Sequence, residues 1–248
     1  CSSCYSFFGF APDGKLYLAT GVSGNRLHVT ANPSVATATS VAWSVSTAYP
    51  ISLRSDPTVS SMAFASATKA FIGTYGDGIL LTTNLSATGT TWAYKNDGIY
   101  SSYGKEIEIA GTRLLMITNG GNKGLYQSTD GGSTWSFNIL PDYINSLVKM
   151  PNGSVIAYGG SGLFYSTDNG ATWSAKVAQG FNSIVSSPSN VLYGTNSSQI
   201  KVSSDNGATW PTVISMTGLP TSFYFPNKIP IDVAGSVDLF AHVYNYDI

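Results

Sequence analysis

The sequence predicts an all-β protein, a β-propeller built from repeated four-stranded antiparallel blades. First, the octapeptides STDGGSTW, STDNGATW and SSDNGATW recur at 128–135, 166–173 and 203–210, 38 and then 37 residues apart. A fixed period of about 20–50 residues is typical of repeat proteins. Second, each period contains four short β-rich runs separated by turn residues. Third, no stretch keeps an apolar period of about 3.6 residues, so helices should be nearly absent.

The five tryptophans each close a copy of one pattern, S/T-x-D/N-x-G-x-T-W. Trp135, Trp173 and Trp210 end the three clean copies. The copy at 82–92, TTNLSATGTTW, has three extra residues before its glycine, and the copy at 30–43 is longer and has no glycine. The pattern therefore indicates five repeats, with decay towards the N-terminus.

The runs within each repeat predict four strands each. In the fourth repeat they are INSLVKM, SVIAYGG, LFYST and WSAKVA, and the box lies between the third and fourth runs. A solenoid is the alternative, but its rungs are usually shorter and rarely have four strands. The five predicted repeats cover 7–46, 60–96, 105–139, 144–178 and 181–215.

The segment after Trp210 predicts a further, incomplete blade. Residues 222–245 contain two or three strand-like runs but no sixth tryptophan. We therefore expect six blades, the last of which lacks its box, in one domain over 6–248. Residues 1–5 form a tether or closing segment, and CSSCYSFF (1–8) is a candidate to complete the last blade. Alternatively, the chain continues past Ile248, or a strand of another subunit fills the open edge, which would give self-association.

The repeated octapeptides resemble the Asp-box, or BNR, repeats of sialidases, xyloglucan-cleaving glycosidases, sortilin-type receptors and photosystem II assembly factors. The three clean boxes carry the resemblance, and weaker similarity extends over about residues 5–215. The resemblance implies a propeller, with the boxes on a face away from the ligand-binding mouth. It does not specify a function.

The box residues suit a tight turn. A carboxylate can accept backbone N–H groups across the turn, a glycine allows positive φ, and a tryptophan packs on the adjoining sheet. A calcium loop needs three or more oxygen-rich positions, whereas each box has a single acid, so no metal site is expected. The structural box residues are therefore Asp130, Gly132, Trp135, Asp168, Gly170, Trp173, Asp205, Gly207 and Trp210.

Composition excludes several classes of function. The 12 basic and 13 acidic residues give a net charge of −1, without the basic excess typical of nucleic-acid binding. No apolar run approaches the ~20 residues of a transmembrane helix. No phosphate-binding or dinucleotide motif is present, so no cofactor is expected. Only 10% of residues are charged, and the polar residues are mainly Ser, Thr, Asn and Tyr.

Cys1 and Cys4 leave three interpretations of the N-terminus. In the first, Cys1 is the lipidated first residue of a lipoprotein, and the lipid is the only contact of the protein with a membrane. Alternatively, the two cysteines form a disulfide or bond a neighbouring chain in an oxidising compartment. The third interpretation is a simple boundary of the chain. All three are compatible with an extracellular or cell-surface location.

The ligand site is predicted on the face opposite the boxes, in the two longest inter-blade loops, 46–60 and 95–106. Tyrosine rings stack on the C–H faces of sugars, while amides and acids bind hydroxyl groups. Tyrosine is also common in β-rich proteins, so each residue alone is weak evidence. The candidate ligand-binding residues are Tyr49, Arg54, Asp56, Asp97, Tyr100, Tyr103 and Glu106.

Enzyme activity is not favoured, and no catalytic residue is assigned. A glycosidase needs two carboxylates about 5–10 Å apart. The loop candidates Asp56, Asp97, Glu106 and Asp142 belong to no recognisable motif. Sialidases of the resembled families use three arginines and a Tyr–Glu pair, whereas the three arginines of this chain and the neighbouring Glu106 and Glu108 do not match that arrangement.

The sequence thus favours a non-enzymatic, secreted or surface-tethered propeller that binds a glycan or a cell-surface protein. A structural subunit of an extracellular filament or viral appendage is the first alternative, consistent with the low charge and the incomplete last blade. A glycoside hydrolase, or a fragment of one, is the second.

Overall fold

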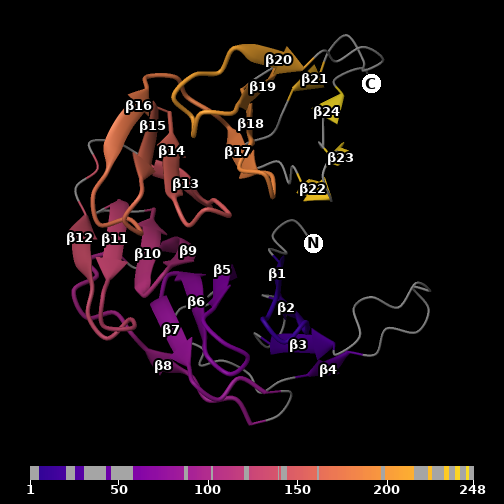
Figure 1. The fold of residues 1–248 in the computed structure, drawn as a ribbon. Coiled ribbons are helices and arrows are strands. Elements are labelled where there is room, and N and C mark those ends of the chain that lie inside the picture. Colours follow the sequence, from indigo (N-terminus) through magenta and orange to yellow (C-terminus); the bar gives the residue numbers. More distant parts are fainter. Residues whose placement is uncertain are drawn as a thin grey trace. The chain divides into compact units, whose positions relative to one another are not determined.

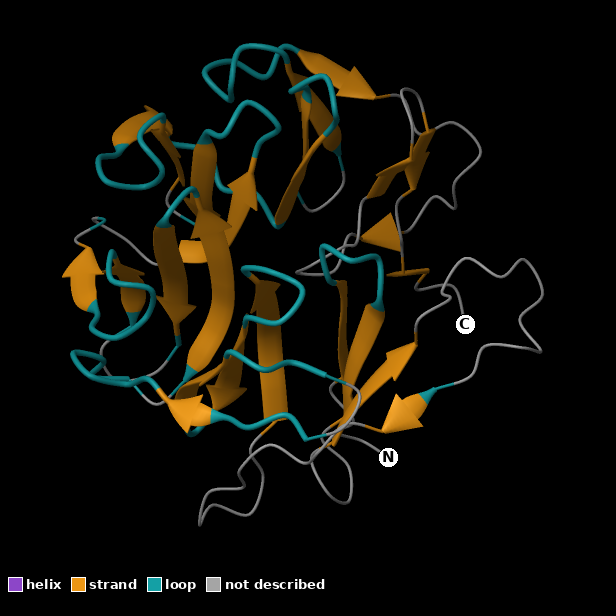
Figure 2. Cartoon of the chain, turned by 60° about the horizontal axis from the view of Figure 1, so that its bottom comes forward, coloured by secondary structure: helices purple, strands orange, loops and turns teal. Residues whose placement is uncertain are grey.

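The computed structural model describes most of the chain, and every described secondary-structure element is a strand, as Figure 2 shows. Cys1, Cys4, Tyr49, Arg54 and Asp56 lie outside the described residues. Within the described ranges, no helix is long and apolar enough to cross a bilayer. The described residues are 6–20, 26–30, 43–45, 58–86, 89–101, 103–119, 123–138, 140, 144–160, 162–196, 199–214, 223–224, 232–234, 238–240 and 244–245.

Five four-stranded antiparallel sheets, called sheets 1 to 5, follow one another along the chain (Figure 1). In each sheet the strands pair in sequence order, so neighbours in the chain are neighbours in the sheet. The five predicted repeats are confirmed. The chain divides into two compact units, 1–139 with sheets 1 to 3 and 140–248 with sheets 4 and 5.

The strands of the first unit agree closely with the predicted runs. Sheet 1 contains β1 (Ser6–Phe10), β2 (Leu16–Thr20), β3 (Arg26–Thr30) and β4 (Ser44–Val45). Sheet 2 contains β5 (Thr58–Phe64), β6 (Ala70–Tyr75), β7 (Gly78–Thr82) and β8 (Ala93–Tyr94). Sheet 3 contains β9 (Gly104–Ala110), β10 (Arg113–Thr118), β11 (Gly124–Ser128) and β12 (Ser136–Asn138).

The second unit contains two full sheets and two short ladders. Sheet 4 contains β13 (Ile144–Lys149), β14 (Val155–Gly159), β15 (Gly162–Ser166) and β16 (Ser174–Val177). Sheet 5 contains β17 (Ser183–Ser186), β18 (Leu192–Thr195), β19 (Ile200–Ser203) and β20 (Thr212–Ile214). The short strands are β21 (Phe223–Tyr224), β22 (Asp232–Ala234), β23 (Asp238–Phe240) and β24 (Tyr244–Asn245).

The C-terminal segment differs from the expected partial blade. Its four short strands form two separate ladders, β21 with β24 and β22 with β23, in place of one sheet. The suggestion that residues 1–8 complete this blade is wrong for Ser6–Phe8, because these residues pair with Leu18–Thr20 in sheet 1. Residues 1–5 lie outside the described residues, and the count of six blades stays a prediction.

Sheet 2 has side chains buried on both of its faces. Met62, Ile72 and Leu80 belong to the cluster shared with sheet 1. Their sequence neighbours Ala63, Phe71 and Ile79 belong to the cluster shared with sheet 3. Because side chains alternate across a strand, one continuous apolar run such as AFI fills two cores at once.

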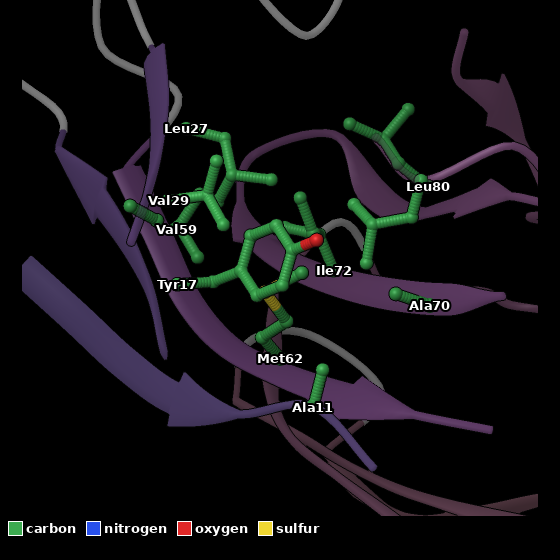
Figure 3. Packing of buried hydrophobic residues seen from close by; sticks show 11 residues of the cluster. Ala11, Tyr17, Leu27, Val29, Val59, Met62, Ala70, Ile72 and Leu80 are labelled. Atoms are coloured by element: carbon green, nitrogen blue, oxygen red, sulfur yellow. The ribbon is translucent and has the colours of Figure 1, made fainter. Parts of the chain in front are cut away.

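The core between sheets 1 and 2 is visible in Figure 3, where the ring of Tyr17 lies among Val29, Val59, Met62 and Ile72. Tyr17 is 1% exposed. Its ring centroid lies 5.4 Å from that of Phe64, so an aromatic contact also joins the two sheets. Burying a side chain such as Ile72 contributes about 1.5–3 kcal/mol. These contacts hold the two sheets face to face.

The boxes connect the third and fourth strands, as predicted, and the three clean copies share the hydrogen bonds of their serine, aspartate and threonine side chains. In the box of sheet 4, the Asp168 carboxylate accepts the Thr172 amide at 2.9 Å and the Thr172 hydroxyl at 2.6 Å. The Ser166 hydroxyl donates to Asp168 at 2.7 Å and accepts the Gly170 amide at 2.7 Å. The sequence predicted hydrogen bonds to the aspartate carboxylate only. In the structure, the serine and threonine side chains complete a closed network around it.

Corresponding residues in the other two boxes make equivalent bonds. Asp130 accepts the Thr134 amide at 2.9 Å, and Asp205 accepts the Thr209 amide at 2.9 Å. In the imperfect box of sheet 2, the side-chain oxygen of Asn84 accepts the Thr91 amide at 2.9 Å. An amide oxygen therefore replaces the carboxylate, and the turn tolerates the inserted residues.

The tryptophans all stand just before the fourth strand, but they are buried to different extents. Trp135 and Trp210 are 5% and 9% exposed and belong to the clusters shared with the preceding sheet. Trp92 is partly buried against the cluster of sheets 1 and 2. Trp43, in the first repeat, is 41% exposed. That repeat is also the one whose box has lost its glycine.

Hydrogen bonds lower the pKa values of the box carboxyl groups. The pKa of Asp168 is lowered to about 2, first by the Thr172 hydroxyl and then by the Thr172 amide. The pKa of Asp205 is lowered to about 2 by the equivalent groups of Thr209. The Thr134 amide, followed by its hydroxyl, lowers the pKa of Asp130 well below its usual range. The carboxylates of these three aspartates therefore stabilise the box turns.

Acid should therefore weaken the boxes. A carboxyl group with a lowered folded-state pKa stabilises the fold above its unfolded-state pKa of about 3.9, and the stabilisation is lost as pH falls through the folded value. We expect the melting temperature to fall between about pH 4 and pH 2. The double variant Asp168→Asn/Asp205→Asn should show a shallower fall in thermal melts followed by circular dichroism. An equal slope in both proteins would contradict this assignment.

A substitution at Gly132 tests the contact between a box and the preceding sheet. Its φ is +88°, and an added Cβ would lie 2.7 Å from Cε1 of Phe71. Gly14→Ala is a matched control, because Gly14 has a φ of +81° and no atom within 4 Å of the added Cβ. Gly14→Ala should cost about 1–2 kcal/mol for the backbone conformation, and Gly132→Ala about 1–3 kcal/mol more for the collision. Urea unfolding measures both, and equal losses would refute the packing role.

Candidate functional site

A groove in the first unit contains one of the predicted ligand residues and several that were not predicted. It has a volume of about 450 Å³ and lies between the β6–β7 turn and the loop from β8 to β9. We call it the tyrosine groove. Its lining residues are Gly76, Asp77, Tyr94, Asn96, Ile99, Tyr100 and Ser101.

The groove lies at the end of sheet 2 opposite to its box. Strand β7 begins at Gly78, next to the groove, and ends at Thr82, where the box begins. Antiparallel pairing puts the β6–β7 turn and the segment after β8 at the same end of the sheet. This separation agrees with the expectation that inter-blade loops and boxes occupy different faces.

Asn96 fixes the groove wall by joining the turn to strand β7. Its Oδ1 accepts the Ile79 amide at 2.7 Å, and its Nδ2 donates to the Asp77 carbonyl oxygen at 2.8 Å. Gly78 has a φ of +75°, and a Cβ at this position would collide with the Asn96 side chain. The glycine therefore permits both the tight turn and the close approach of Asn96.

Two tyrosine rings present apolar faces to solvent at this site. Tyr94 is 46% exposed and Tyr100 is 76% exposed. Burial, followed by the negative charge of Asp77, raises the pKa of Tyr94. Tyr94 therefore stays a neutral hydrogen-bond donor at physiological pH, and its phenol lies within electrostatic reach of Asp77.

The loop that carries Tyr100 is attached to sheet 3. The Trp135 amide donates to the Asp97 carbonyl oxygen at 2.9 Å, and the Ile99 amide donates to the Asn96 carbonyl oxygen at 2.9 Å. Gly98 has a φ of +83°, and an added Cβ would collide with the carbonyl oxygen of Trp135. The tryptophan that closes the third box thus also holds the loop of the groove.

The other described candidates lie outside the groove lining. Asp97 is exposed and contributes its backbone carbonyl to the Trp135 contact. Tyr103 packs against Tyr75, with ring centroids 6.1 Å apart at 67°. Glu106 lies on β9 and pairs with Ile117 of β10. The ligand-binding roles of these residues, and of Tyr49, Arg54 and Asp56 outside the described residues, stay predictions.

Four polar groove residues were not predicted from the sequence: Asp77, Tyr94, Asn96 and Ser101. The sequence feature that could have identified Asp77 is the short turn YGDG (75–78), which joins a second to a third strand. Such turns were expected on the ligand face, but candidates were chosen only from long loops. Tyr94 and Asn96 flank the start of one of these loops, where neither was chosen.

A second groove, of about 510 Å³, lies in the other unit between the β13–β14 and β17–β18 turns. The Asn152 amide donates to Asn190 Oδ1 at 3.0 Å and joins the two turns. This groove has no aromatic ring in its described lining, which consists of Lys149, Met150, Pro151, Gly153, Ser186 and Pro188. It is less suited to stacking on a ligand than the tyrosine groove.

Among the described residues, no group of three or more His, Cys, Asp or Glu side chains could hold a metal ion.

The Gly98 contact yields a test of loop attachment. Gly98→Ala should detach the Trp135 amide from Asp97 and increase hydrogen exchange over residues 96–101, because the added methyl collides with the backbone. Gly89→Ala is the matched control, since Gly89 has a φ of +78° and nothing within 4 Å of an added Cβ. If both variants leave exchange in the loop unchanged, Trp135 does not hold it.

The fold was compared with known proteins. The sequence matches no protein-family model, and no curated protein matches it either. Among solved structures, YCF48 bound to a D1 peptide has a TM-score of 0.61 at 19% identity, over 86% of this chain and 72% of that chain. YCF48 from Cyanidioschyzon merolae has a TM-score of 0.51 at 12% identity, over 75% and 72% of the two chains.

A third similar structure is the extracellular domain of BT4673 from B. thetaiotaomicron. Its TM-score is 0.62 at 13% identity, and the match covers 99% of this chain. The chain spans only 32% of that larger structure. Identities this low show the fold alone. Together with the five four-stranded sheets, these similarities show that the chain has the β-propeller fold.

Proposed function

We propose that the chain is a binding protein that recognises a glycan through the tyrosine groove. The observation that carries this proposal is the convergence of two exposed tyrosine rings with Asp77 and Asn96 in one groove. Tyrosine rings stack on the apolar faces of sugars, and the carboxylate and amide groups bind hydroxyls. A volume of about 450 Å³ falls within the range of about 300–1,000 Å³ typical of small-ligand sites.

The hydrogen bonds that hold the groove walls to sheets 2 and 3 support binding by a preformed site. Asn96 makes two hydrogen bonds that join the turn to β7, and Trp135 holds the loop before Tyr100. A rigid site loses less conformational entropy when it binds a ligand. The tyrosines contribute contact area with few rotatable bonds, so ordering them also costs little.

The groove supports binding rather than hydrolysis. Glycoside hydrolysis uses two carboxyl groups at the scissile bond. The described groove lining contains one, that of Asp77. A glycosidase is therefore the weaker hypothesis, and the hypothesis of a filament subunit rests on the low charge and the expected incomplete last blade rather than on this groove.

A protein segment is the second candidate ligand. The solved structure of YCF48, which shares the fold, contains a D1 peptide. This observation favours a peptide only through the fold, whereas the exposed tyrosines belong to this chain. We also propose an extracellular or cell-surface location, supported by the similarity to the extracellular domain of BT4673 and by the low content of charged residues.

Glycan binding can be tested on an array, followed by calorimetric titration of any hit. Tyr94→Ala and Tyr100→Ala should each weaken binding by about tenfold or more, because each removes a stacking surface and a hydroxyl. Phe10→Ala is the control, since Phe10 is 61% exposed and lies on β1 outside the groove. Binding that survives both tyrosine substitutions would show that the groove is not the site.

A further inference from the structure

The tyrosine groove contains an acidic side chain that has no basic partner among the described residues. Asp77 is the only acidic or basic residue in its described lining. The Oδ2 atom of Asp77 is buried and has no hydrogen-bond partner. Within the described part of the chain, Asp77 pairs with no basic side chain. A carboxylate that is partly removed from water without a partner is costly, and a cation in the groove would offset that cost.

The neighbouring residues do not supply this cation. Lys95 lies between Tyr94 and Asn96 in the sequence, but it is not among the lining residues. Its backbone amide still pairs with the Ile79 carbonyl oxygen, so the chain there continues the strand geometry of β8. Among the described residues, no ion pair joins Lys95 to Asp77.

The two tyrosines add a second feature that favours a positive ligand. The π faces of tyrosine rings attract ammonium groups, and the attraction increases where water is excluded. Tyr94 lies within electrostatic reach of Asp77, and Tyr100 lines the same groove with 76% of its surface exposed. A carboxylate beside two tyrosine rings is a suitable environment for an ammonium group.

We propose that the tyrosine groove selects a sugar that carries a free ammonium group, with Asp77 as the residue that distinguishes it from a neutral sugar. This inference rests on the proposed glycan-binding function and names the class of glycan. The ammonium group of such a sugar faces the Asp77 carboxylate while its ring stacks on a tyrosine. Asn96 keeps one Nδ2 hydrogen for a ring hydroxyl, since its two bonds within the chain use the other hydrogen and the oxygen.

A rigid amino sugar fits these features better than a lysine side chain. A pyranose ring has apolar C–H faces that match exposed tyrosine rings, and its ammonium group is held close to the ring. A lysine ammonium group lies at the end of a flexible stem that loses rotamer freedom on binding. The open groove and its remaining polar donors therefore favour the amino sugar.

The test compares two oligosaccharides that differ only in acetylation. The probes are a glucosamine hexamer and an N-acetylglucosamine hexamer, titrated by calorimetry at about pH 5.5, where a primary amine is protonated. Asp77→Asn removes the charge and keeps the shape. Only the backbone amide and carbonyl of Asp77 take part in its described hydrogen bonds, so the variant should fold. Asp13→Asn is the control, because it removes an equal charge from an exposed acid between β1 and β2, outside the lining.

We expect the glucosamine hexamer to bind at least about tenfold more tightly than the acetylated hexamer. Asp77→Asn should remove this preference, and Asp13→Asn should leave it intact. If both hexamers bind equally to the wild type and Asp77→Asn changes nothing, the ammonium inference is overturned while glycan binding stands. If neither hexamer nor any array glycan binds, both proposals fail. If trilysine binds through Asp77 and the hexamers do not, a basic peptide replaces the amino sugar.

Discussion

The requirement to bury both faces of a sheet governs this structure. In sheet 2, Phe71 and Ile72 are adjacent in sequence but belong to different cores. If such a sheet stood alone, it would expose apolar side chains on both faces to water, so it needs a neighbour on each side. The repeat is the solution, because the same module supplies both the face to be covered and the face that covers it. Each blade is consequently stable only within the series.

The boxes turn this stacking into a defined geometry. Their carboxylates hold the turns between third and fourth strands, and two of their glycines lie against the preceding sheet: Gly132 against Phe71 and Gly207 against Leu163. A local turn and a contact between sheets are thus the same structural element. Asn84 shows that the hydrogen-bond geometry matters more than the charge, since its amide oxygen accepts the equivalent backbone amide.

The tyrosine groove depends on this arrangement although it lies at the other end of sheet 2. The loop from β8 to β9 must cross from one sheet to the next, and Trp135 of the third box holds it on the way. The rigidity of the blades therefore extends to a loop that carries exposed rings. One carboxylate oxygen of Asp77 is buried without a hydrogen-bond partner, whereas the box carboxylates are well satisfied, and this contrast is the basis of the role proposed for Asp77.

Much of the architecture could be predicted because its causes are local. The period, the alternation of apolar residues, and the Asp–Gly–Thr chemistry of the turns all act within a few residues, so the strands and the box geometry followed from the order of the letters. The exposure of Trp43 could not be predicted in this way, because the burial of a box tryptophan depends on packing against another sheet as well as on the local turn. The chain by itself determined a repeated four-stranded module and the turn that closes it, since hydrogen bonds over four residues require no distant partner. Only the tertiary structure decided which polar residues meet in one groove. Antiparallel pairing and the Trp135 contact bring Asp77, Tyr94 and Tyr100 together from separate segments. Neither interaction can be predicted from the sequence next to any one of these residues.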